Sequence, residues 1–219
     1  PELRGELAAA LTQQYRVDFK SYNVSYGSTT KAIRFRMSNS GKSVTSESRS
    51  AFSLSWQADG GISAKYSDHG LNDGVANDVD TKTYKGPFGD PSENFNQVID
   101  VSIVGNNLTA GTYTYNFFGV ERTLNPQSYD FYVNGSLVNT STNVWEANGL
   151  SYTLEKSAAD YDPALGLQQF GLLGSSDSDV GPDVHFDDII LTVIPEPATI
   201  GLLGISGVFM FAARRLRRK

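Results

Sequence analysis

Apolar and polar residues alternate with a period of two along most of this chain, from residue 15 to residue 194. The segments 15–19, 33–37, 52–56 and 99–103 each place an apolar side chain at every second position. Strict alternation of this kind is typical of a β-strand that buries one face. The chain offers about ten or more such strands and no convincing helix, so the pattern predicts an all-β fold, an antiparallel two-sheet β-sandwich.

Two local patterns make this prediction more specific. Asn134-Gly135 separates two alternating runs, and an Asn-Gly pair in that position predicts a hairpin with a type I′ turn. In the last strand, 184–194, the apolar parity shifts between Phe186 and Ile189. Such a shift predicts a β-bulge, or burial on both faces of the strand.

Two parts of the chain break the alternation. Residues 59–97 are rich in Gly, Asp and Asn, and we expect one short strand at 62–66 within an otherwise long loop. Residues 1–14 are expected to form a short helix or a disordered segment. The predicted sandwich domain therefore covers residues 15–194.

The tail, residues 195–219, is organised differently, in three parts. It begins with the polar motif Pro195, Glu196 and Pro197, and residues 198–213 that follow carry no charge. As a helix this run would span about 24 Å, a little less than a hydrocarbon core of about 30 Å, so we predict one short transmembrane helix. Residues 214–219 form a basic end that should stay in the cytoplasm; its cations are Arg214, Arg215, Arg217, Arg218 and Lys219.

This three-part tail resembles the PEP-CTERM protein-sorting signal of Gram-negative bacteria. The resemblance implies recognition by a membrane-embedded processing enzyme of the exosortase type, which would cut near Pro195-Glu196-Pro197. It also implies a precursor anchored in the inner membrane, then a protein at the cell surface or in the extracellular polymer matrix. A short core helix with a solvated basic end is the simpler alternative, and a GPI signal is disfavoured because it would end in its apolar segment.

An exported protein needs a signal peptide, and the start of this sequence does not supply one. Ala8-Ala9-Ala10 fits a cleavage pattern, but no apolar region precedes it. We therefore expect the native chain to begin before Pro1.

Two further segments resemble the concanavalin A-like jelly roll, specifically its laminin-G-like domains. They are the hairpin sequence 129–138 and the closing segment 186–190. The resemblance implies a jelly-roll sandwich over residues 15–194. Because some relatives of this fold bind carbohydrate, the resemblance also implies an extracellular polysaccharide as partner, which is an inference by analogy.

Charge and cysteine content exclude several classes. The tail holds five of the 18 cations and one of the 24 acidic residues, so residues 1–194 carry 13 cations and 23 acids, a net charge of −10. An acidic body argues against a nucleic-acid partner. The chain has no cysteine, which excludes disulfides and thiolate metal sites.

The sequence contains none of the catalytic motifs considered for this fold. Glycoside hydrolases of this fold type use two spaced carboxylates, and the sequence contains no E-x-D-x-x-E pattern around any glutamate. No G-x-S-x-G surrounds a serine, and the two histidines, His69 and His185, lack metal-ligand spacing. We therefore predict that the protein is not an enzyme, with a glycan-active enzyme as the third reading.

Calcium is the one candidate cofactor. Asp177, Asp179 and Asp183 lie close together before the last strand, and carboxylate oxygens in a loop suit Ca²⁺. A second Asp- and Asn-rich cluster spans 72–80. The alternative is that these residues simply form turns.

Carbohydrate binding is the leading function, with a structural or adhesive exoprotein lacking a defined ligand as the alternative. Sugar sites combine an aromatic face with polar groups, and the candidate aromatics are Trp56, Tyr66, Tyr84, Trp145 and Tyr161. Trp56 also sits at an alternating position, as a core residue would. An open aromatic groove on one sheet would favour the carbohydrate reading.

Overall fold

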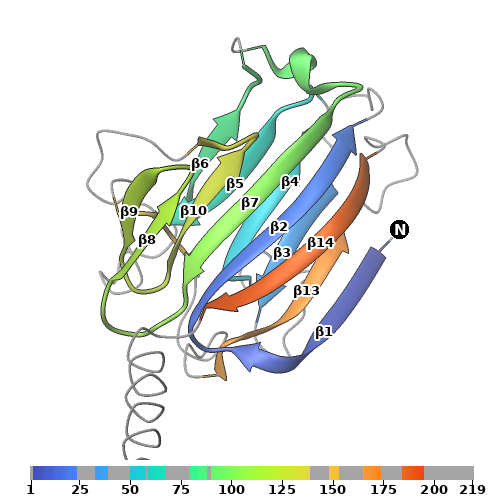
Figure 1. Cartoon of the computed structure of the whole chain (residues 1–219). Coiled ribbons are helices and arrows are strands. Elements are labelled where there is room, and N and C mark those ends of the chain that lie inside the picture. Colours follow the sequence, from blue (N-terminus) through green and yellow to red (C-terminus); the bar gives the residue numbers. More distant parts are fainter. Residues whose placement is uncertain are drawn as a thin grey trace, which may run out of the picture.

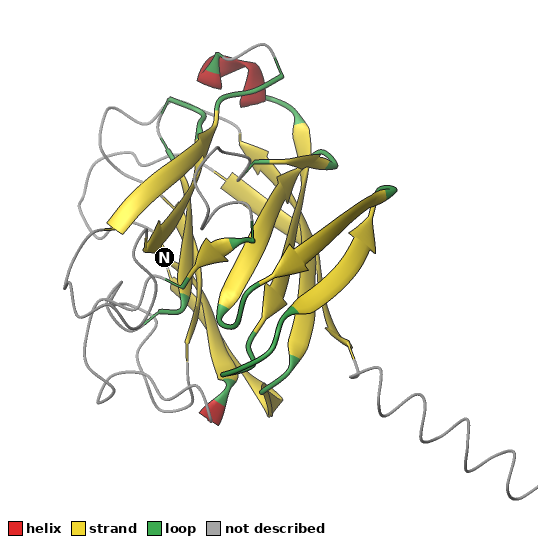
Figure 2. Ribbon diagram, turned by 90° about the vertical axis from the view of Figure 1, so that its left-hand side faces the viewer, coloured by secondary structure: helices red, strands yellow, loops and turns green. Residues whose placement is uncertain are grey.

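A computed structural model describes most of the chain before residue 195. The described residues are 2–23, 33–38, 50–57, 59–67, 79–87, 90–138, 148–152, 165–173 and 184–194. Strands make up most of this part of the molecule, as Figure 2 shows. The predicted all-β fold is confirmed for it.

In the described part of the chain the strands follow one another, and a short 3₁₀ helix, Pro91–Asn94, lies between β6 and β7. They are β1 (Glu2–Leu11), β2 (Gln14–Asn23), β3 (Ile33–Ser38), β4 (Phe52–Trp56), β5 (Ile62–Ser67), β6 (Val79–Tyr84), β7 (Val98–Asn106), β8 (Tyr113–Phe117), β9 (Val120–Leu124), β10 (Ser128–Val133), β11 (Ser136–Leu137), β12 (Leu150–Ser151), β13 (Leu167–Leu173) and β14 (Val184–Ile194).

The described strands form two antiparallel sheets, one large and one small. The large sheet has 12 strands, with the order β1-β13-β3-β4-β5-β12-β10-β7-β2-β14, while β6 adds to β5 and β11 to β10. This sheet folds over on itself, so that β14, β2, β7 and β10 form one layer and β3, β4 and β5 lie behind them (Figure 1). The second sheet is the hairpin β8–β9.

The hydrophobic core lies between the two layers. Phe19 of β2 lies 5.2 Å from Phe35 of β3 between ring centroids, and Phe52 of β4 lies 5.1 Å from Tyr129 of β10. All four rings belong to one buried cluster. Burial of large aromatic side chains from both layers holds the folded-over sheet together, and gives the two-layer sandwich that the alternation predicts.

The first strand corrects one prediction. Residues 2–11 form β1 and pair with β13, where a helix or disorder was expected. The odd positions 3–11 read Leu, Gly, Leu, Ala, Leu, so small residues hide the alternation. A Cβ at position 5 would lie 2.2 Å from the Phe170 ring, so a larger residue there would require this ring to move. Tertiary pairing therefore decides the state of this segment.

The segment 59–97 also holds more structure than predicted. The expected strand appears as β5, but β6 follows it and pairs with it in register from Ile62 with Tyr84 to Ser67 with Val79. The 3₁₀ helix is attached to the β4–β5 turn, because the Asn94 amide donates to the Gly60 carbonyl at 2.9 Å. The long loop is thus shorter than its Gly- and Asp-rich composition indicated.

The two specific local predictions are confirmed. Asn134 and Gly135 have φ angles of 49° and 75° and join β10 to β11, as a type I′ turn requires. In β14 the register with β2 shifts between Asp187 and Ile190, and Asp188 has a φ of 53°. The parity change in the sequence therefore marks a bulge.

Candidate functional site

The outer face of the layer β10-β7-β2-β14 carries a row of polar side chains. Alternate residues of β2 and β7 point away from the core, and the register sets Ser102 beside Asp18 and Asp100 beside Lys20. The bulge brings Asp188 of β14 to Lys20. We call Arg16, Asp18, Lys20, Ser102 and Asp188 the polar strip.

Arg16 is held in place by an ion pair with Asp18 and by a ring contact with Phe117. Its Nε donates to Asp18 Oδ1 at 2.9 Å and lies 2.7 Å from Oδ2. Asp18 Oδ1 also accepts a 2.6 Å hydrogen bond from the Ser102 hydroxyl. The guanidinium carbon lies 4.3 Å from the centroid of the Phe117 ring, in a cation–π contact. A donor and an acceptor thus lie side by side in fixed positions on an open face.

The second ion pair of the strip lies nearer the sheet edge. Lys20 Nζ donates to Asp188 Oδ2 at 2.5 Å, and the two side chains are 48% and 53% exposed. The hydrogen bond and charge of Asp188 raise the pKa of Lys20, and Asp100 and Asp187 add to this effect. Lys20 therefore stands among three carboxylates.

The hairpin β8–β9 covers one end of this face. Its inward side chains Tyr115, Phe117 and Leu124 bury Val104 and Tyr132, which point outward from β7 and β10. This second apolar cluster is separate from the main core. The hairpin therefore forms a wall beside the polar strip.

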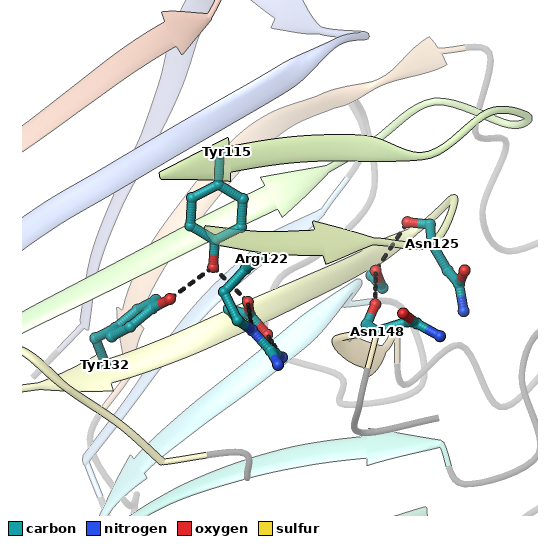
Figure 3. Close-up of polar contacts among 7 residues, drawn as sticks. Tyr115, Arg122, Asn125, Tyr132 and Asn148 are labelled. Carbon is teal, nitrogen blue, oxygen red and sulfur yellow. Dashed lines mark hydrogen bonds and ion pairs between the residues drawn. The ribbon is translucent and has the colours of Figure 1, made fainter. Parts of the chain in front are cut away.

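A buried polar cluster fixes the hairpin to the sheet (Figure 3). Arg122 of β9 binds Asp130 of β10 through two hydrogen bonds of 3.0 Å, from Nε to Oδ2 and from Nη2 to Oδ1. Tyr115 donates to the same carboxylate, and its hydroxyl lies 2.8 Å from that of Tyr132. Asp130 is fully buried. Burial, followed by the charge of Asp130, raises the pKa of Tyr115, and burial raises that of Tyr132.

The turn of the hairpin is strained. Phe118 and Gly119 have φ angles of 49° and 80°, nearly the same as the 49° and 75° of Asn134 and Gly135. Both hairpins therefore use a turn with two positive φ angles, for which Asn-Gly is favoured. Phenylalanine in the left-handed region is an outlier, since its Cβ and ring are crowded there.

The Phe118 side chain is also open to solvent. It is 70% exposed, and its ring meets Phe117 edge to face at 4.4 Å. Phe117 also contacts the Arg16 guanidinium, so the exposed Phe118 ring is linked to the polar strip through Phe117. An accessible aromatic ring next to fixed donors and acceptors can bind a ligand that has both an apolar face and polar groups.

The structure places the predicted aromatic candidates differently. Trp56 is fully buried, and its indole Nε1 donates to the Ser21 hydroxyl at 3.1 Å, so it belongs to the core. Tyr84 is partly buried at the end of β6. Trp145, Tyr161 and the side chain of Tyr66 lie outside the described residues.

Sequence reasoning did not find Arg16 or Phe118. In the sequence, Arg16 is one of several polar residues that alternate with buried ones, and this pattern does not distinguish a site residue from an ordinary surface residue. A signal for the turn was present, since Phe118-Gly119 separates two alternating runs, but phenylalanine does not mark a type I′ turn.

The calcium candidates Asp177, Asp179 and Asp183 lie outside the described residues, as do residues 72–78 of the second cluster. Across the part of the chain that is described, no three His, Asp or Glu side chains come together so as to hold a metal ion.

The sorting motif Pro195, Glu196 and Pro197 and the basic end 214–219 are likewise outside the described residues. None of the described helices is long and apolar enough to cross a membrane, and the predicted transmembrane segment 198–213 is not among them.

The fold and the outer face of β10-β7-β2-β14 together define a jelly-roll β-sandwich with a mixed aromatic and polar surface. Comparison with known proteins identifies the sorting signal that follows it. Residues 193–218 match the PEP-CTERM protein-sorting motif. The predicted signal is thereby confirmed. It implies export and a membrane-anchored precursor that an exosortase-type enzyme recognises. No curated protein matches the chain in sequence.

Solved structures with a similar fold are β-sandwiches of the jelly-roll type. A family 7 alginate lyase in complex with its substrate has a TM-score of 0.50 and 9% identity, over 89% of this chain and 71% of the lyase. Human galectin-16 has a TM-score of 0.44 and 12% identity, over 89% and 95%. The binding domain of botulinum neurotoxin serotype G has a TM-score of 0.42 and 11% identity over 90% of this chain, which spans 37% of that protein. At 9% identity, the similarity to the alginate lyase shows the fold alone.

Proposed function

We propose that this exported protein acts at the cell surface or in the extracellular matrix and binds carbohydrate. The site is the outer face of β10-β7-β2-β14, between the hairpin β8–β9 and the edge strand β14. Phe118 supplies an aromatic surface for a sugar ring, and the polar strip supplies hydrogen bonds to hydroxyl groups.

The turn at Phe118 carries this proposal. The same chain uses Asn-Gly for the equivalent turn at Asn134-Gly135, with nearly the same φ angles. A phenylalanine in this conformation costs stability, and the edge-to-face contact with Phe117 offsets part of that cost. The ring is nevertheless 70% exposed, so the turn holds it where a ligand can reach it, which supports a role in binding.

The polar strip supports the same function. Arg16 and Asp18 have side chains that are 37% and 26% exposed, so a ligand can reach both. Each sugar hydroxyl both donates and accepts a hydrogen bond. A fixed Arg–Asp pair offers both partners without further loss of side-chain entropy.

We also propose that the site binds without catalysis. Asp18 accepts hydrogen bonds from both Arg16 and Ser102, which suits an acceptor for hydroxyl groups better than a proton donor. Incubation with a panel of polysaccharides should release no reducing ends and no unsaturated products. Either product would identify a glycan-active enzyme instead.

The test is Phe118→Asn, which removes the ring but keeps a turn-compatible residue. Loss of a ring contact of about 1–1.5 kcal/mol should weaken glycan binding about tenfold, as measured by affinity electrophoresis. The free energy of unfolding should change by less than about 1 kcal/mol, because relief of the left-handed strain offsets the lost contact with Phe117.

Asn116→Ala is the matched control, since Asn116 is exposed on the opposite side of the same hairpin. It should leave binding unchanged. Full affinity in Phe118→Asn would contradict the proposed site. No binding of the unaltered protein to any glycan would favour the structural or adhesive alternative.

A further inference from the structure

We infer that the ligand of this face is a neutral polysaccharide, recognised through its hydroxyl groups, and not one that carries uronate or sulfate groups. This inference rests on the proposed carbohydrate site and specifies its ligand class. The observation behind it is the pairing of the cations on the face.

Each described Lys or Arg on this face is already bound to a carboxylate of the protein. Arg16 is paired with Asp18 at 2.7 Å and Lys20 with Asp188 at 2.5 Å. Under the hairpin, Arg122 is paired with Asp130 at 3.0 Å. A polyanion would have to replace these partners, so it gains little from the cations it meets.

The carboxylates outnumber the cations. Asp100 and Asp187 also lie on this side of β7 and β14 and act on Lys20. The described Lys and Arg residues of the face number three and its carboxylates five, a net charge of −2; they are Arg16, Lys20 and Arg122 against Asp18, Asp100, Asp130, Asp187 and Asp188. Residues 1–194 add a wider negative field, with 13 cations and 23 acids. The net negative charge of the face and that of residues 1–194 both repel an acidic polymer.

The hydrogen bonding of Arg16 also favours a neutral ligand. Its Nε edge, one side of the fork that binds carboxylates in pairs, is occupied by Asp18. The terminal nitrogens have no partner among the described residues, and remain available as hydrogen-bond donors. With the charge compensated by Asp18, these donors suit a neutral hydroxyl oxygen, while Asp18 accepts from a neighbouring hydroxyl.

The experiment compares neutral and acidic polymers directly. The full chain in mild detergent is run in affinity electrophoresis against laminarin, dextran and galactomannan, and against alginate, polygalacturonate and chondroitin sulfate, at low and high salt. We expect binding to at least one neutral polymer, with an affinity that changes less than about twofold with salt, because charge contributes little. We expect no retention by the acidic polymers.

Two outcomes would overturn the inference, and they are distinguishable. Binding to acidic polymers alone would overturn the ligand class but keep the carbohydrate site. Binding to none of the polymers would overturn the proposed function together with the inference.

Asp18→Asn tests the role of the pair. It should weaken binding to the neutral polymer about tenfold and create salt-sensitive retention by alginate, because the Arg16 charge is then uncompensated. Glu121→Gln is the control, since it removes the same charge from an exposed position on β9 that points away from the sheet. Equal retention by alginate in both variants would show an effect of net charge and would contradict the assignment to this pair.

Discussion

Asp130 shows how one residue can hold an element in place. Asp130 lies on the outer face of β10, and it is fully buried there because the hairpin β8–β9 covers it. Its carboxylate binds Arg122 and Tyr115, both from the hairpin. A buried charge is tolerated only when such partners are present.

Asp130→Asn should therefore be strongly destabilising. The substitution leaves the Arg122 guanidinium, whose side chain is 15% exposed, without its charged partner. We expect a loss of about 3 kcal/mol in the free energy of unfolding, measured by urea denaturation. Asp18→Asn, which breaks an ion pair with one side chain 37% exposed, should cost less than about 1 kcal/mol. Equal losses in the two variants would contradict this account.

At the scale of elements, the hairpin β8–β9 shapes the candidate site. It is attached to the sheet by a small apolar cluster and by the polar cluster around Asp130, not by strand pairing with the main sheet. At its base, the backbone N–H of Asn125 donates to the Asn148 carbonyl at 2.9 Å. The Ser128 hydroxyl lies between the carbonyl oxygens of Asn125 and Asn148, at 2.8 Å and 3.3 Å (Figure 3). The hairpin positions Phe117 under Arg16 and presents Phe118, so the site depends on its attachment.

This attachment predicts a loss of stability at alkaline pH. Burial raises the pKa of Tyr115 and Tyr132 above the ordinary value of about 10. Above that pH the unfolded chain releases these protons while the folded protein retains them, so unfolding becomes more favourable. Each such tyrosine should lower the free energy of unfolding by about 1.4 kcal/mol per pH unit.

Urea denaturation between pH 8 and 11 tests this prediction. Stability should be constant below about pH 10 and fall above it. Tyr115→Phe should make the decline less steep, although it also lowers stability at neutral pH through the lost hydrogen bond to Asp130. An unchanged slope in Tyr115→Phe would show that this tyrosine is not responsible.

At the scale of the whole molecule, the sandwich and the sorting signal are directly connected. β14 ends at Ile194, and the PEP-CTERM match covers residues 193–218. The last strand of the domain therefore leads into the signal without a linker. The processing enzyme would act close to the folded domain.

Glu196→Ala tests the signal. In a host that contains an exosortase-type enzyme, this variant should accumulate as uncleaved, membrane-bound precursor, seen as a larger species in the membrane fraction by immunoblotting. Binding of glycan by the variant should be unchanged, because the proposed site lies on the sandwich. Normal release of the variant would contradict a role of Glu196 in recognition.

The sequence by itself determined the local features of this protein. Alternation along 15–19 and 99–103 predicted strands with one buried face, because the side chains of a strand point to opposite sides. The same holds for the Asn134-Gly135 turn, the bulge near Asp188 and the sorting motif, each of which is written in a few consecutive residues.

Only the tertiary structure decided which surfaces meet. It made a strand of residues 2–11 by pairing them with β13, and laid the hairpin β8–β9 over one end of the outer face. These outcomes depend on contacts between residues far apart in the chain, which local periodicity does not encode. For the same reason, the polar strip and the strained Phe118 became recognisable as one candidate site only once the hairpin was placed beside β2 and β7.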